Sequence, residues 1–185
     1  MRTVLRDGRV RWLVLYYAAL FVWLRLAFYT YQPKLEEIGR RDLLAIGALF
    51  AALNVAAAIV SRFAHRIVGF FGDRSILFGM QAALLASFVF LGRSRWDLAF
   101  LVFFVQQAPF GLHFPVLYNA TNRLLPSERR GTVLSLQSLV GRLAFAGYFA
   151  LFGPWVDAFG LESAYLVSAA IGGVVLVALT ATRPR

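Results

Sequence analysis

Long blocks of apolar residues recur along the chain and constrain its fold more than any other feature. Each block holds roughly 17 to 25 residues, the length that an α-helix needs to cross a hydrocarbon core of ~30 Å. The blocks lie at about residues 11–32, 43–61, 75–91, 98–122, 131–152 and 163–182. None of them alternates polar and apolar residues with a period of two, which argues against a β-barrel. The sequence therefore predicts an all-α fold, a polytopic membrane helical bundle of about six transmembrane helices.

Composition agrees with this fold and narrows the function. Of the 185 residues, 60% are hydrophobic and 15% are charged, which is too little charge to cover a soluble domain. The net charge of +10 would indicate nucleic acid as the partner of a soluble protein. Here the basic residues lie between the apolar blocks, where membrane orientation explains them, so we expect the lipid bilayer and no nucleic acid. The chain has no Cys, so disulfides and thiolate metal sites are excluded, and we expect no cofactor or metal.

The distribution of basic residues predicts the orientation. With six spans, one side of the membrane holds twelve of them: Arg2, Arg6, Arg9, Arg11, Arg62, Arg66, Arg74, Arg123, Arg129, Arg130, Arg183 and Arg185. The other side holds five: Lys34, Arg40, Arg41, Arg93 and Arg95. The positive-inside rule places both termini in the cytoplasm of a multi-pass protein of the cell inner membrane. A signal peptide is the alternative at the N-terminus, but the run at 12–31 is too long and no small-residue cleavage site follows it.

Polar residues within the spans are the candidate functional residues, because ionisable groups in a membrane cost roughly 2.5–3.5 kcal/mol on insertion scales. Arg25, Tyr29 and Gln32 recur at spacings of three and four, which places them on one helix face. We interpret this stripe as the lining of a cavity that meets a polar or anionic group of a substrate. The alternative is that Arg25 extends to the membrane interface.

The fourth block contains a segment that should not form a regular helix. Pro109 and Pro115 lie near mid-membrane with Gly111 between them, which removes backbone hydrogen bonds and predicts a bend. Transporters place such helices along the substrate cavity. Gln106 and Gln107 precede the bend, and His113 within it is the mid-membrane group that normally titrates near neutral pH. A structural hydrogen-bonding role is the alternative for His113.

Arg142 lies near mid-depth in the fifth block and shares a face with Ser135 and Ser138. It is too deep to reach the interface, so we expect it to contact protein, water or substrate; a structural ion pair or carbonyl contact is the alternative. The predicted substrate-binding residues are therefore Arg25, Tyr29, Gln32, Gln106, Gln107, His113 and Arg142. No Asp or Glu lies within a block, so proton coupling would depend on His113 or on a carboxylate elsewhere.

Several segments carry recognisable motifs. They are the run at 130–143, the G-x-x-x-D-x-x-G pattern at 153–160, the segment 31–39 with Pro33, Glu36, Glu37 and Gly39, and the positions Pro115, Asn119, Pro126 and Arg130. The first two resemble the eleventh helix and its end in bacterial major facilitator superfamily (MFS) transporters. The third resembles the end of the seventh helix, and the four single positions resemble the tenth helix with its cytoplasmic loop. One motif departs from the pattern. Ser61, His65 and Arg66 take the Gly, Asp and Arg positions of the superfamily's gate motif, so a charge-relay gate is not expected there.

The resemblance implies that the chain is the C-terminal six-helix half of an MFS permease, with residues 1–11 as the end of a cytoplasmic linker and 11–182 as the half-transporter domain. Such a protein moves a small-molecule substrate by alternating access, here with efflux as the expected direction. Its first and fourth helices line the central cavity, and its third and sixth face lipid. The expected partner is the missing N-terminal six-helix half or a second copy of the chain.

Three other functions remain open from the residues. A homodimeric half-transporter and a non-transporting membrane fragment share the same fold. A six-helix intramembrane protease of the rhomboid type needs a G-x-S-x-G-like nucleophile with a partner His. Ser135 and Ser138 lack that context, and His65 and His113 do not lie in the matching helix, so no catalytic residue is predicted.

Overall fold

The computed structural model describes residues 7–94 and 99–184, which form five α-helices and one short 3-10 helix. These are α1 (Gly8–Glu37), α2 (Leu43–Arg62), α3 (Ala64–Leu91), η1 (Ala99–Leu101), α4 (Val102–Leu124) and α5 (Ser127–Ala181). Neither described range contains a strand, which confirms the predicted all-α fold. The linker end at 1–6, the turn at 95–97 and the residues Arg2, Arg6, Arg95 and Arg185 lie outside the described residues.

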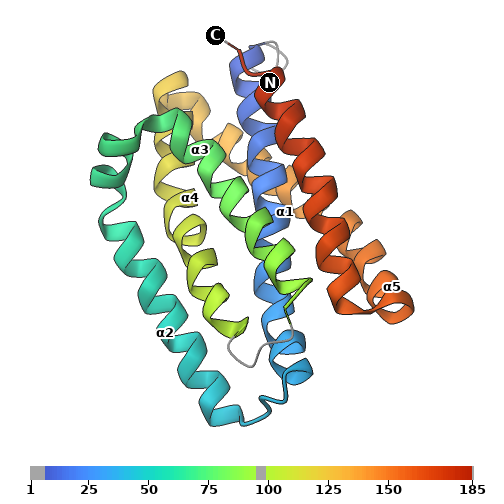
Figure 1. The fold of residues 1–185 in the computed structure, drawn as a ribbon. Helices are drawn as coiled ribbons and strands as arrows, with labels where there is room; N and C mark the ends of the chain where they lie inside the picture. The colour runs from blue at the N-terminus through green and yellow to red at the C-terminus, as the bar shows by residue number, and fades with distance from the viewer. Residues whose placement is uncertain (1–6, 95–98, 185) are drawn as a thin grey trace.

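The five α-helices of the described residues are long and apolar enough to cross a membrane, and α5 is long enough to cross it twice. Its 55 residues would extend ~80 Å if straight, far more than the ~30 Å core. The helix is interrupted at Gly160, whose φ of 80° and ψ of 161° are not helical. Figure 1 shows the chain reversing there, and Tyr148 hydrogen-bonds Ser168 between the two segments at 2.7 Å. The bundle therefore contains six membrane-length segments, with α5 supplying 127–159 and 161–181.

Two helices run further than the sequence indicates. α1 continues past Pro33 to Glu37, and its last turn is closed by an ion pair between Lys34 and Glu37 at 2.8 Å. The segment 62–74, expected to be a loop, is helical from Ala64, and only Gly72 (φ 76°, ψ 152°) interrupts it. Lys34 is buried within the bundle, and its ion pair with Glu37 compensates the charge there.

α4 continues as one helix through Pro109 and Pro115, so the two prolines do not end it. Pro115 lacks the N–H that would bond the carbonyl of Gly111, but the helix retains helical dihedrals on both sides. Packing against α2 supports the part of α4 around Gly111. Gly111 faces α2 so closely that a side chain there would overlap the carbonyl oxygen of Ala57 and lie 3.0 Å from Val60 Cβ. The contact with α2 therefore holds α4 where its own hydrogen bonding is weakest.

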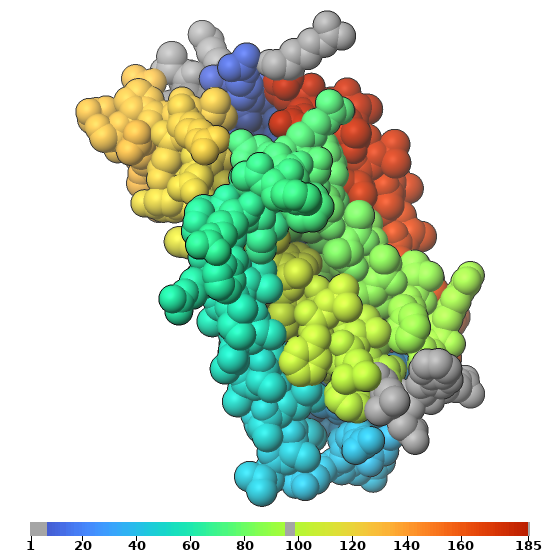
Figure 2. Space-filling view, turned by 60° about the vertical axis from the view of Figure 1, so that its left-hand side comes forward, coloured from blue at the N-terminus to red at the C-terminus, as the bar shows by residue number. Residues whose placement is uncertain are grey.

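The helices are arranged around α1 and α4. α2 packs on α4, both segments of α5 pack on α1, and α3 contacts α4 and α5. Figure 2 shows α4 between α2 and α3 on the face turned to the viewer. α1 is the most buried of the membrane-length helices and α2 the least, with buried shares of 61% and 11% of their most apolar windows. α2 thus lies at an edge of the bundle, with most of its apolar surface uncovered.

The helix ends and the connections of the described residues are divided between the two ends of the bundle. The beginning of α1 and the end of α5 lie at the same end of the bundle in Figure 1, together with the α2–α3 and α4–α5 connections. The α1–α2 connection and the bend at Gly160 lie toward the opposite end. Asp7 and Asp42 cap the starts of α1 and α2 by accepting bonds from Arg9 N (2.8 Å) and Leu44 N (2.9 Å).

Candidate functional site

The surface formed by α1, α4 and the segment 127–159 of α5 carries several of the predicted site residues, and we call it the open face. Tyr29 is 51% exposed there, and its ring stacks on Phe145 of α5 with centroids 5.5 Å apart and planes at 16°. The Phe149 ring lies at the same centroid distance from Tyr29 and 5.1 Å from Phe145. These rings form an exposed aromatic platform between α1 and α5.

Arg25 lies on α1 one turn from Tyr29, with its guanidinium carbon 5.0 Å from the centroid of the Phe21 ring. Its side chain is partly exposed. No carboxylate in the described ranges pairs with it, and its charge is met by the face of an aromatic ring instead. Along the helix axis Arg25 lies only ~4 Å from the midpoint of α1, far from either end of the helix.

Arg142 is exposed on α5, and its Nε donates a hydrogen bond to Ser138 Oγ at 3.3 Å. It lies within ~2 Å of the midpoint of the segment 127–159. The neighbouring Gly141 packs directly on α1, where an added Cβ would lie 2.9 Å from Tyr17 Cε1. An added Cβ at Gly141 would also lie 3.2 Å from Phe21, the residue whose ring Arg25 covers, so the two arginines approach the same part of the α1–α5 contact.

His113 lies at the midpoint of α4 and is half-buried. Its Nδ1 is 2.6 Å from the carbonyl oxygen of Phe110, which can only accept, so Nδ1 carries the proton and Nε2 is left as an acceptor. No described residue bonds Nε2. α1 and α4 pack against each other, and His113 lies on a half-buried part of α4.

The glutamines do not share this position. Gln106 is 1% exposed and donates from Nε2 to Ser87 Oγ of α3 at 2.8 Å, while its Oε1 has no partner in the described residues. Gln107 donates to the Tyr31 hydroxyl of α1 at 2.9 Å. Gln32 lies at the exposed end of α1 and bonds Glu36 at 3.0 Å. The structure therefore places Arg25, Tyr29 and Arg142 along the contact of α1 with α5, His113 on the neighbouring α4, and the three glutamines elsewhere.

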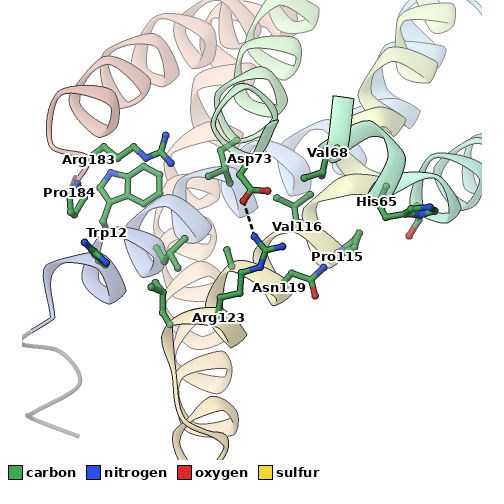
Figure 3. Close-up of a pocket in the computed structure, with 18 residues that line it drawn as sticks. Trp12, His65, Val68, Asp73, Pro115, Val116, Asn119, Arg123, Arg183 and Pro184 are labelled. Atoms are coloured by element: carbon green, nitrogen blue, oxygen red, sulfur yellow. Dashed lines mark hydrogen bonds and ion pairs between the residues drawn. The ribbon is translucent and has the colours of Figure 1, made fainter. Parts of the chain in front are cut away.

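A cavity of about 600 Å³ opens at the end of the bundle where α1 begins and α5 ends (Figure 3). Its lining residues are Arg9, Trp12, Leu13, Ser61, Ala64, His65, Val68, Gly69, Asp73, Leu77, Pro115, Val116, Asn119, Ala120, Arg123, Leu124, Arg183 and Pro184. Across it Arg123 Nη1 of α4 pairs with Asp73 Oδ2 of α3 at 3.0 Å. Arg183 lies over the rings of Trp12 and Phe78, at 5.7 and 5.8 Å.

The Asp73–Arg123 pair was not predicted from the sequence. His65, which lines the same cavity, takes the Asp position of the superfamily's gate motif. The acidic residue that pairs with Arg123 is Asp73, eight residues further along the chain. The order of the spans could have indicated this pair, because Asp73 and Arg123 both fall between predicted spans on the same side of the membrane. No group of three or more His, Asp or Glu side chains within 7–94 and 99–184 could hold a metal ion.

The fold, with its six apolar membrane-length segments and mid-depth polar face, defines a polytopic helical membrane protein. A family profile described as Major Facilitator Superfamily matches residues 40–185. The chain therefore belongs to the major facilitator superfamily, whose members are membrane transporters. A comparison with curated proteins finds no match.

Proposed function

We propose that the chain is the C-terminal six-helix half of a bacterial MFS permease that exports a small solute by alternating access. One observation carries this proposal. Arg25, His113 and Arg142 lie near the midpoints of three membrane-length segments, where they are exposed or half-buried, and no described carboxylate pairs with either arginine. Groups so costly to place in lipid indicate a water-filled cavity or a protein partner facing them.

The partner of the open face is the N-terminal six-helix half, and the central cavity lies between the two. α2 supports this assembly, because a helix of such high hydropathy with only Leu53 and Ala57 buried has apolar surface available for a neighbour. Lipid alone would also cover that surface, so the polar residues of the open face are the stronger support. A second copy of the chain is the alternative partner, related by a two-fold axis.

The expected setting is the cell inner membrane with both termini in the cytoplasm. This orientation is supported by the excess of basic residues at the end of the bundle where α1 begins. Export as the direction is supported only by the resemblance of the motif-bearing segments, since no contact in the bundle distinguishes the two directions.

Transport is tested in inverted membrane vesicles that contain the protein expressed from its natural gene, with any coding sequence that adjoins this chain. We expect accumulation of a solute from a panel of labelled sugars and amphipathic drugs, lost in Arg25→Gln and retained in Arg40→Gln. Arg40 is a matched control, because it too lies over a ring, that of Phe100 at 5.6 Å, but outside the open face. Equal accumulation with and without the protein would refute transport of these solutes.

Cross-linking distinguishes the two possible partners, the N-terminal half and a second copy of the chain. The sequence offers a cysteine-free background for it. Ala146→Cys lies one turn from Arg142 on the open face, and Ala170→Cys is exposed on the second segment of α5. A homodimer through the open face predicts a disulfide dimer of Ala146→Cys and none of Ala170→Cys. Flux through the purified chain without dimer formation would show that no second half is needed.

A further inference from the structure

We infer that the open face selects an organic anion with an aromatic ring, most simply an aromatic carboxylate. The inference rests on the proposed transport function and names the class of substrate for it. Its basis is the combination of two guanidinium groups with an exposed aromatic platform, in a region of the chain without any acidic side chain.

The charge of the substrate follows from the balance of ionisable groups. All nine carboxylates of the sequence lie outside the mid-membrane region, at helix ends and in connections. Arg25 and Arg142 lie near the midpoints of their segments. Arg25 covers the ring of Phe21, and Gly141, next to Arg142, packs on the same Phe21, so two positive charges flank one part of the α1–α5 contact. A single anion is attracted by both, whereas a cation entering the same region is repelled by both.

The chemistry of the cationic groups favours a carboxylate. A guanidinium presents planar, forked N–H donors that match the two oxygens of a carboxylate. Arg25 donates no hydrogen bond to any described residue and contacts only the ring of Phe21, so its donors are available. Arg142 uses one donor, Nε, on Ser138 and keeps its terminal nitrogens available in the same way.

The rings that flank these arginines indicate that the substrate carries an aromatic ring beside its anionic group. Tyr17, Phe21, Phe145, Tyr29 and Phe149 form a continuous series along the α1–α5 contact, with neighbouring centroids 5.1–6.5 Å apart. Tyr29 is 51% exposed and Phe149 36% exposed, so part of this platform is open to a ligand. A flat aromatic ring stacks on such a surface at spacings of ~4.5–7 Å.

The test uses the purified full chain and a set of probes that differ in charge or in aromatic character. They are 2-naphthoate, its neutral methyl ester and the cation 2-naphthylmethylammonium, with cyclohexanecarboxylate as the anion without an aromatic ring. Binding is measured by isothermal titration. We expect 2-naphthoate to bind at least tenfold more tightly than the ester, the cation or cyclohexanecarboxylate.

Variants test whether the preference for 2-naphthoate arises at the open face. Arg25→Gln and Arg142→Gln should each weaken 2-naphthoate binding at least tenfold and leave binding of the ester within about twofold. Arg40→Gln should change neither. Arg25→Lys keeps the charge and should retain part of the affinity, and it serves if a glutamine variant does not fold. Equal affinity for acid and ester, tighter binding of the cation, or the same loss in Arg40→Gln would overturn the inference.

Failure of this inference is distinguishable from failure of the proposed function. Selective binding of 2-naphthoate without flux in vesicles would sustain the anion site and contradict transport. Flux of another solute, with no preference for the acid over its ester, would sustain transport and contradict the substrate class. A partner half that neutralises the arginines with its own carboxylate would give this second result in the assembled protein.

Discussion

Gly111 illustrates how a single residue determines the packing of this bundle. At this position α4 lies against the backbone of α2, and the nearest groups are the carbonyl of Ala57, Val60 Cβ and Ser61 N. Backbone atoms cannot rotate away as the end of a side chain can, so the absence of a Cβ is required for this approach. Membrane helices commonly use small residues for close contact, because apolar surface alone gives no drive for association in lipid.

The first prediction is that Gly111→Ala destabilises the bundle. Separating α2 from α4 should cost about 1–3 kcal/mol, the usual range for overpacking. The measurement is reversible unfolding in mixed micelles as the fraction of denaturing detergent rises. Gly47→Ala in α2 is the control, because a Cβ there meets nothing within 4 Å. Equal stability of Gly111→Ala and Gly47→Ala would show that α2 does not pack at Gly111.

At the scale of elements, the reversal within α5 depends on backbone conformation. Gly160 has a φ of 80° and a ψ of 161°, a region that side-chain-bearing residues essentially do not occupy. This residue converts a 55-residue helical run into two segments that cross back on each other. Trp155 Nε1 donates to Ser163 Oγ at 2.9 Å across the bend and helps to hold it.

The second prediction concerns this bend. Gly160→Ala should lower the free energy of unfolding by about 1–3 kcal/mol, the cost of a strained backbone position. Gly153→Ala, in the helical part of α5 with open space around it, should be neutral or stabilise by up to about 1 kcal/mol. Both are measured in the same micelle titration. A Gly160→Ala protein as stable as Gly153→Ala would contradict the bend.

The third prediction concerns the ion pair between α3 and α4. Asp73 and Arg123 are 54% and 70% exposed, so water and salt screen their attraction. A double-mutant cycle of Asp73→Asn and Arg123→Gln should give a coupling energy below about 1 kcal/mol that falls as salt rises from ~0.01 M to ~1 M. A coupling above about 2 kcal/mol, insensitive to salt, would mean that the pair is buried in the assembled transporter.

At the scale of the whole molecule, the even number of segments places the start of α1 and the end of α5 at one end of the bundle. The fourth prediction tests which side of the membrane this is. In intact cells, a membrane-impermeant maleimide should label Arg40→Cys in the α1–α2 connection and leave Arg183→Cys unlabelled until the membrane is permeabilised. The reverse pattern would invert the orientation.

Much of this architecture could be predicted from the sequence. The apolar blocks determine how many times the chain crosses the bilayer, because backbone polar groups in lipid must be bonded within helices. The motif-bearing segments determine the superfamily, which the family profile confirms. Arg25 and Tyr29 could be placed on one helix face because spacings of three and four hold wherever the helix is regular.

Only the tertiary structure decided which side of each helix faces its neighbours. Gln106 and His113 lie seven residues apart on α4, yet Gln106 is buried against Ser87 while His113 is half-buried. Lipid is as apolar as the bundle interior, so the sequence of a membrane helix carries little amphipathic signal to distinguish inside from outside. The sequence by itself therefore determined the number, the order and the class of these helices. Their rotation, the aromatic platform and the pairing of Asp73 with Arg123 depended on contacts between residues far apart in the chain.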